Sequence, residues 1–404
     1  MNEYETLSKA KKNLRISWYR CPIEKDILRN LTLKNDWQGF LQAGGHFILF
    51  LLTGLITYYF WSLGNWNAFI LMLFFHGTIS SFFSGVAPHE LGHGTVFRTR
   101  AYNKGFLYLF SLISWWDPYD YAVSHTYHHR YTMYSVADRE NLSPLQPSLN
   151  LGLMLQVFTF NLFSKPSRTF GKGGLFFAIY LTFLSALGKN GSTDIPSQEW
   201  LQSLHEDQPS EHIKSIRWSK LLLIFHGGIL LISIFSGQWV LSLIVSVAPF
   251  TANWASYFVG LTQHCGLKDT EPDFRKNTRT ITLNPILSFL YWQMNWHIEH
   301  HMFAGVPCYN LKKLHKCVAD DMPNPRTLIG AWKEMRAVWR KQQNDSEYQF
   351  DTPVPSSIKT NYKASADPLE SSIGDLAPKS LSLIHISEPT RRYAISYAVF
   401  CLKK

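Results

Sequence analysis

Two long tracts without a charged side chain constrain this 404-residue chain more than any other feature. No Asp, Glu, Lys or Arg occurs from Trp37 to His89, and none occurs from Leu221 to Leu267. Each tract could supply about two helices of ~20 residues, the length that crosses the ~30 Å hydrocarbon core of a bilayer. Helices are expected because an open sheet would leave backbone groups unpaired in lipid. The sequence therefore predicts an all-α integral membrane protein.

A polar break within each tract predicts a tight helical hairpin. Residues 64–67 (Gly-Asn-Trp-Asn) interrupt the first tract, and residues 236–239 (Ser-Gly-Gln-Trp) interrupt the second. Two hairpins give four transmembrane helices and return every long segment to one side of the membrane. The predicted spans are at about residues 44–63, 68–86, 219–235 and 239–258.

The basic residues indicate which side that is. Neither hairpin tip carries Lys or Arg, whereas residues 1–36 carry eight of them. The positive-inside rule then places both termini and the segment between the hairpins in the cytoplasm. We therefore expect a cytoplasmic N-terminal segment at 1–36 and a membrane domain at 37–340. Because the basic charge follows membrane topology, it is not evidence for a nucleic-acid partner.

The segment between the hairpins is expected to form a cytoplasmic helical cap. It contains three apolar runs of 12 to 14 residues, near 105–116, 150–163 and 174–187. These runs are too short for ordinary spans, so they predict helices that lie at the interface or pack against the spans. Residues 189–218 are polar and lack strong periodicity, which predicts a loop.

Two C-terminal segments are set apart from the membrane domain. Residues 341–380 are rich in Ser, Pro, Asp and Lys and predict a disordered tail. Residues 381–404 contain the strings Leu-Ser-Leu-Ile-His-Ile-Ser-Glu-Pro-Thr-Arg and Ile-Ser-Tyr-Ala-Val-Phe-Cys-Leu-Lys-Lys. Both strings resemble in-frame translations of a sequencing-library adaptor. This segment is therefore interpreted as an artefact and not as part of the natural protein.

Eight of the sixteen histidines lie in three clusters of spacing HxxxH, HxxHH and HxxHH. Positions i, i+3 and i+4 share one face of a helix, so each cluster presents two or three imidazoles in one direction. The predicted topology places all three clusters on the cytoplasmic side, where they can converge. The eight residues are His89, His93, His125, His128, His129, His297, His300 and His301.

This number of imidazoles predicts two metal ions. A zinc site usually takes four ligands, whereas two metals with four or five nitrogens each fit the count. Imidazole suits iron, zinc, copper and nickel, so the ligand type alone does not name the metal. His264, at the end of the fourth predicted span, is a candidate ninth ligand. The remaining histidines of residues 1–380 are interpreted as hydrogen-bonded structural residues: His46, His76, His205, His212, His226 and His315.

Two other classes of protein fit the clusters less well. Residues 89–93 also satisfy HExxH, the zinc metalloprotease signature, with Glu90 as general base. An intramembrane protease of that kind needs a further ligand, usually an Asp in a later span, and residues 221–267 contain no acidic residue. A metal transporter would place its site near the bilayer midplane, whereas these clusters lie at one face. The zinc protease is kept as a remote alternative.

The three clusters, in this order and at these positions relative to the hairpins, resemble the membrane fatty acid desaturase and hydroxylase superfamily over residues 40–320. Residues 88–97 (Pro-His-Glu-Leu-Gly-His-Gly-Thr-Val-Phe) and 295–303 (Asn-Trp-His-Ile-Glu-His-His-Met-Phe) are similar to bacterial members. The resemblance implies a bacterial inner-membrane protein with a di-iron centre held by the eight clustered histidines and His264. It further implies O₂-dependent attack on an unactivated C–H bond, as a desaturase of acyl-lipid or acyl-CoA chains. Hydroxylation of a fatty acid or alkane is the alternative.

The sequence contains no recognisable motif of a fused electron-transfer domain. Neither the His-Pro-Gly-Gly haem string of some relatives nor a GxGxxG fingerprint occurs. Electrons are therefore expected from a separate ferredoxin-like carrier. Candidate docking residues for an acidic carrier are Arg98, Arg100, Lys104, Arg275, Lys276 and Arg279.

Histidine ligands usually donate their outer N–H to a carboxylate or carbonyl. Candidate acceptors near the clusters are Glu90, Asp117, Asp120, Asp138, Asp273 and Glu299.

Overall fold

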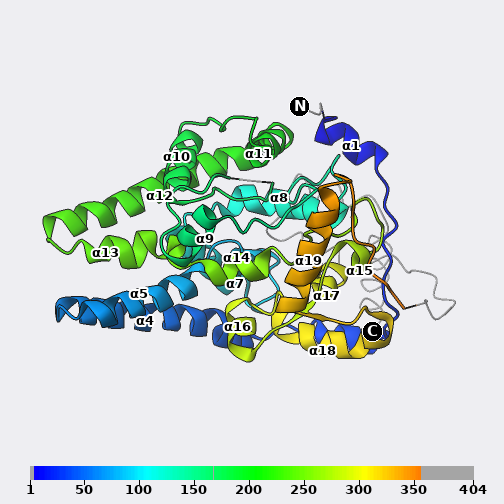
Figure 1. The fold of residues 1–404 in the computed structure, drawn as a ribbon, viewed down its shortest axis with the longest axis horizontal. Coiled ribbons are helices and arrows are strands. Elements are labelled where there is room, and N and C mark those ends of the chain that lie inside the picture. The colour runs from blue at the N-terminus through cyan, green and yellow to red at the C-terminus, as the bar shows by residue number, and fades with distance from the viewer. Residues whose placement is uncertain (1–3, 167, 356–404) are drawn as a thin grey trace, which may run out of the picture.

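The first charge-free tract folds into a hairpin, as expected. The computed structural model describes residues 4–166 and 168–355, and it is mostly helical. Gly64 turns the hairpin with φ +67°, a left-handed conformation that glycine adopts without strain. Two hairpins project from one side of a larger helical body (Figure 1). The first consists of α3 (Asp36–Gly39), π-helical η1 (Phe40–Gly44), α4 (Gly45–Ser62) and α5 (Trp66–Ser81).

The second hairpin is less regular. Its first arm is one long helix, and Gly237 turns the chain with φ +68°. Its second arm changes from α to π and then to 3₁₀ geometry before the chain enters the body. The elements are α12 (Pro209–Phe235), α13 (Val240–Ser242), η2 (Leu243–Val247), η3 (Ala248–Phe250) and α14 (Trp254–Gly260).

Three helices of the described residues are long and apolar enough to cross a membrane: Asp36–Ser62, Trp66–Gly92 and Pro209–Phe235. They correspond to three of the four predicted spans. The segment predicted as the fourth span, 239–258, is an apolar helix only over Val240–Phe250. The four-span topology therefore stays a prediction.

A proline explains why the second arm breaks. Pro249 has no N–H, so the carbonyl of Ile244 lacks the i→i+5 donor that a π-helix would supply. Nε2 of His76 lies 2.8 Å from that carbonyl oxygen and donates instead. Beyond the break, the amide of Asn161 donates to the carbonyl of Phe250 at 2.7 Å. Irregular backbone at membrane depth needs such partners within the protein.

The segment between the hairpins is more helical than expected. The three short apolar runs form α7, α9 and α10. The loop predicted over 189–218 is wrong, because these residues form α11 and the first turns of α12. The buried face of α11 is half polar, with Ser197 and Gln198 beside Trp200 and Leu204, so its periodicity is weak. The helices are α6 (Val86–Gly92), α7 (Arg100–Ile113), α8 (Pro118–Tyr131), α9 (Leu151–Phe158), α10 (Leu175–Ala186) and α11 (Pro196–Asp207).

Most of the remaining elements lie near α17, at the end of the body away from the hairpin tips, whereas α1 packs against α11 (Figure 1). Two short strands pair in parallel, with Ile281 opposite Arg326. The elements are α1 (Leu7–Asn13), α2 (Lys25–Leu31), α15 (Phe274–Asn277), β1 (Ile281–Thr282), α16 (Pro285–Leu290), α17 (His297–Met302), α18 (Cys308–Val318), η4 (Ala319–Asp321), β2 (Arg326–Thr327) and α19 (Leu328–Gln342).

Contacts with the body continue past the predicted domain end at residue 340. The amide of Phe350 donates to the carbonyl of Gly266 at 2.8 Å, and Asp351 pairs with Lys268 at 2.9 Å. The rest of the predicted tail, 356–380, and the segment 381–404 interpreted as adaptor-derived lie outside the described residues.

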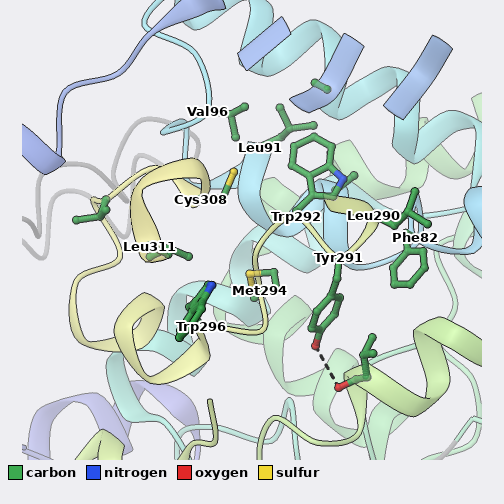
Figure 2. Close-up of a cluster of buried hydrophobic side chains, with 14 of the residues drawn as sticks. Phe82, Leu91, Val96, Leu290, Tyr291, Trp292, Met294, Trp296, Cys308 and Leu311 are labelled. Carbon is green, nitrogen blue, oxygen red and sulfur yellow. Dashed lines mark hydrogen bonds between the residues drawn. The ribbon is translucent and has the colours of Figure 1, made fainter. Parts of the chain in front are cut away.

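One hydrophobic core joins the end of the first hairpin to the helices that carry the first and third histidine clusters. Figure 2 shows Phe82, Leu91 and Val96 near the indole of Trp292 and the ring of Tyr291. The hydroxyl of Tyr291 donates to the carbonyl of Val259 at 3.3 Å, which ties this core to α14. Packing of this kind fixes the relative positions of elements far apart in sequence.

Candidate metal centre

Four elements bring the nine predicted ligands together. The first cluster lies on and just after α6, the second on α8, the third on α17, and His264 follows α14. Pro118 at the first turn and the Asp117 side chain, which accepts from two backbone amides, fix the start of α8. All nine imidazoles are buried, with at most 7% of any residue exposed.

The ligand nitrogens form two groups, and within each group they lie within 4.8 Å of one another. Residues at i and i+4 of a cluster share a group, whereas the middle histidine of each HxxHH cluster enters the other group. Adjacent residues on a helix point about 100° apart, which explains this division. The five-histidine group is His89, His93, His125, His129 and His300, and the four-histidine group is His128, His264, His297 and His301.

The spacing within each group suits a metal ion. Nε2 of His300 lies 2.7 Å from Nε2 of His89 and 3.1 Å from Nε2 of His129. In the other group, Nε2 of His297 lies 3.1 Å from that of His264. Metal–imidazole bonds are about 2.0–2.1 Å, so two ligands at right angles around one ion stand about 2.9 Å apart. The observed separations therefore match neighbours in one coordination sphere.

Acceptors hold the outer nitrogens of three ligand candidates, which leaves their Nε2 atoms to face the group. Nδ1 of His125 donates to Glu140 at 3.0 Å, and Nδ1 of His128 donates to Asp138 at 2.9 Å. Nδ1 of His264 donates to a backbone carbonyl at 2.9 Å. This arrangement fixes the tautomer and orients the ring, as at established histidine–metal sites.

Electrostatics also favour metal binding. Burial lowers the pKa of His129, His297 and His301 well below the ordinary value, and neighbouring imidazoles lower it further. These side chains are therefore neutral and present lone pairs, as metal binding requires. Their donor set is entirely nitrogen, which suits iron among other transition metals.

Of the six predicted carboxylates, Asp138 hydrogen-bonds to a clustered histidine. It also accepts from the backbone amide of Met133 at 2.7 Å. Glu90 is fully buried, with one oxygen 3.3 Å from Nδ1 of His300. Glu299 instead accepts from His315 and from Thr280.

The other three carboxylates serve different contacts. Asp117 and Asp120 share the hydroxyl of Ser215 as a donor, at 2.8 Å from each. Asp120 also pairs with His205 at 2.9 Å. Asp273 pairs with Arg275 at 2.8 Å. Within residues 4–166 and 168–355, none of these three carboxylates hydrogen-bonds or ion-pairs with a ligand candidate.

Sequence reasoning missed Glu140, which contacts His125 as Asp138 contacts His128. The available signal was proximity, because Glu140 lies two residues after Asp138 and eleven after His129. Tyr121 was also missed; its hydroxyl lies 3.1 Å from Nδ1 of His89.

Two of the predicted docking residues cannot meet a carrier. Arg275 is buried between Asp273 and Asp321, and Arg279 is buried against Glu334. The docking interpretation is wrong for both, because their charges neutralise internal carboxylates. Arg98, Arg100 and Lys104 are exposed, and Lys276 is half-buried and pairs with Asp351.

The histidines predicted to be structural lie outside both groups. His46 contacts the carbonyl of Ile79 at 3.0 Å, and His226 contacts the carbonyl of Leu112 at 2.9 Å. The contacts of His46 and His76 satisfy carbonyls within the two hairpins, whereas that of His226 joins the second hairpin to α7. His205 and His212 stack at 3.7 Å between ring centroids, near the start of α12.

A narrow cavity of about 50 Å³ reaches the five-histidine group. Apart from imidazoles, its lining carries no ionisable group other than tyrosine hydroxyls. It is lined by Pro88, His89, Gly92, His93, Leu107, Tyr108, Pro118, Tyr119, Tyr121, Ala122, His125 and Thr126. The cavity therefore offers a mostly apolar approach to one side of the histidine centre.

Comparison with known proteins identifies the family of this chain. No curated protein matches the chain. The family model described as fatty acid desaturase matches residues 64–331. That range is more than half of the chain and contains all nine converging histidines. The chain therefore belongs to the fatty acid desaturase family.

Proposed function

We propose that this protein is a membrane-bound di-iron oxidoreductase that uses O₂ to introduce a double bond into the acyl chain of a lipid or acyl-CoA. The observation that carries the proposal is the pair of buried imidazole groups, five and four, within a fatty acid desaturase domain. When bound, two iron ions would supply the oxidising chemistry. Hydroxylation of a fatty acid or alkane, the related reaction of the superfamily, is the alternative.

The protein's own residues hold the metals and position the substrate. The Nε2 atoms of both groups would bind the ions, while Glu140 and Asp138 hold the outer nitrogens of His125 and His128. The apolar lining beside His89 would keep a hydrocarbon segment against the centre and exclude water, which protects a reactive site from side reactions.

The remote zinc-protease alternative loses support from the same geometry. A catalytic zinc keeps three protein ligands and an open position for water. His89 and His93 instead share their group with three further imidazoles, including His300 of the third cluster. Glu90 faces His300 at 3.3 Å rather than lining the cavity.

The location and partners are part of the proposal. Three long apolar helices support a multi-pass membrane protein. We propose that both termini and the histidine centre face the cytoplasm of a bacterial inner membrane. A separate ferredoxin-like protein would deliver the electrons, with exposed Arg98, Arg100 and Lys104 as candidate contacts.

Metal counting is the direct test. The full chain is purified in detergent after expression with iron, and metals are counted per chain by elemental analysis. The proposal expects about two metal ions per chain. The metal content should fall sharply in a His297→Ala, His301→Ala double variant. It should stay unchanged in a His212→Gln control, whose ring lies outside both groups. One metal that survives the double variant would overturn the di-iron site.

Lipid analysis of cells that express the wild type then separates the two reactions. New double bonds support desaturation, and new hydroxyl groups support hydroxylation.

A further inference from the structure

Two buried polar groups beside the five-histidine group face each other without a formed hydrogen bond. Neither carboxylate oxygen of Glu90 has a hydrogen-bond partner among the described residues, and the same holds for Nδ1 of His300. Glu90 is 0% exposed and His300 is 1% exposed, so solvent does not compensate either group. A buried carboxylate without a partner is costly, so such an arrangement needs a physical explanation.

Their geometry supplies one. An oxygen of Glu90 lies 3.3 Å from Nδ1 of His300, slightly beyond a short charge-assisted hydrogen bond. Nε2 of His300 meanwhile lies near Nε2 of both His89 and His129, inside the five-histidine group. If Nε2 is to bind a cation, its lone pair must be free, and the ring proton must then sit on Nδ1, facing Glu90.

The second cluster shows the same arrangement in completed form. There Glu140 and Asp138 accept from Nδ1 of His125 and His128 at 3.0 and 2.9 Å. With Glu90, the five-histidine group would have carboxylates behind two of its rings, and the four-histidine group has Asp138 behind one.

We propose that Glu90 is a positioning residue whose carboxylate accepts the Nδ1 proton of His300 when metal is bound, so that it orients this ligand and adds negative charge behind the five-histidine site. The inference rests on the proposed metal centre. It also accounts for the burial of Glu90, because a cation on the far side of the His300 ring offsets the buried negative charge.

The chain offers a matched control in Glu299, which lies one residue before His300. Glu299 is also 0% exposed, but it already has internal donors in Thr280, at 2.6 Å, and His315. Removing the Glu299 carboxylate leaves those donors unpaired whether or not metal is present. Removing the Glu90 carboxyl group removes a buried group without a hydrogen-bond partner when metal is absent and a ligand-orienting acceptor when metal is present.

The experiment measures metal retention and metal-free stability in Glu90→Gln, Glu90→Met and Glu299→Met. Iron retention is measured by chelator competition and elemental analysis, and unfolding of the stripped protein is followed in detergent. We expect Glu90→Met to weaken metal binding by about 10- to 100-fold, and Glu90→Gln by less, because its amide oxygen still accepts. Without metal, Glu90→Met should unfold at the wild-type temperature or above it, whereas Glu299→Met should unfold at a lower temperature.

Two results would overturn the proposal. One is a Glu90→Met protein that retains metal like the wild type. The other is a Glu90→Met protein that loses metal and also unfolds early when stripped, as Glu299→Met does, which would make Glu90 a packing residue. If the wild type itself binds fewer than two metals, the proposed function fails. The Glu90 inference is then still judged by whether the variant releases the bound metal.

Discussion

An oxygen of Glu140 lies 3.0 Å from Nδ1 of His125, fifteen residues earlier in the chain. The other oxygen of Glu140 accepts from the hydroxyl of Ser124 at 2.6 Å. That hydroxyl in turn accepts from the indole of Trp200 at 2.9 Å. A line of hydrogen bonds therefore runs from α11 to a metal-ligand candidate and holds its ring in place.

Replacement of Glu140 should weaken the metal site. We expect Glu140→Met to lower iron affinity by about 10- to 100-fold, because the variant has no acceptor to orient the His125 ring. Elemental analysis after chelator competition measures the loss. Glu206→Met, a change at an exposed residue of α11, is the control. Equal metal retention in both variants would contradict the role given to Glu140.

Filling the cavity should block substrate without affecting metal. Ala122 lines the cavity beside His125, and a leucine there would occupy much of its 50 Å³. We expect Ala122→Leu to lower turnover at least tenfold while iron content stays at the wild-type value. Ala101→Leu, on the exposed face of α7, serves as the control. Full activity in Ala122→Leu would show that substrate approaches the histidines by another route.

The broken arm of the second hairpin packs so closely against Gly77 of α5 that a side chain at this position should destabilise the protein. A methyl group there would collide with the backbone carbonyl of Thr251, whereas one at Gly228 of α12 would meet nothing within 4 Å. Overpacking typically costs about 1–3 kcal/mol. We therefore expect Gly77→Ala to lower the thermal midpoint in detergent and Gly228→Ala to leave it unchanged or raised. Equal midpoints would show that the break can move away from α5.

Asp117 should make stability depend on pH. Burial and the neighbouring Asp120 raise the pKa of Asp117 to about 6. A carboxyl whose pKa is raised on folding contributes stability that is fully present below its unfolded pKa of about 3.9 and is lost as pH rises through the folded value. An Asn at position 117 can still cap the N-terminus of α8 but carries no charge.

Unfolding midpoints of the wild type and Asp117→Asn between pH 4 and pH 7 measure this effect. The wild type should lose stability relative to the variant as pH rises. A difference that stays constant over this range would contradict the assignment.

The sequence predicted the two hairpins and the eight clustered histidines from local signals, and it offered His264 from its place at the end of a predicted span. Charge-free tracts define the hairpins, and i, i+4 spacing defines the clusters. The sequence did not predict the division of the histidines into two groups. That division depends on how α6, α8 and α17 are oriented about their axes relative to one another. Pro249 is a local signal for the break in the second hairpin, but the partners that satisfy its carbonyls, His76 and Asn161, are distant in sequence. Glu140 was missed because a loop, with no periodicity to read, returns it to α8.

The way the two HxxHH clusters divide their histidines has a consequence for assembly during synthesis. His128 belongs with the third cluster, and His300 belongs with the first and second. Neither group is therefore complete until the ribosome has passed residue 301, close to the end of the matched family domain. A nascent chain holds only fragments of each site, so under the proposed function both metal ions would enter late, when most of the family domain has been synthesised.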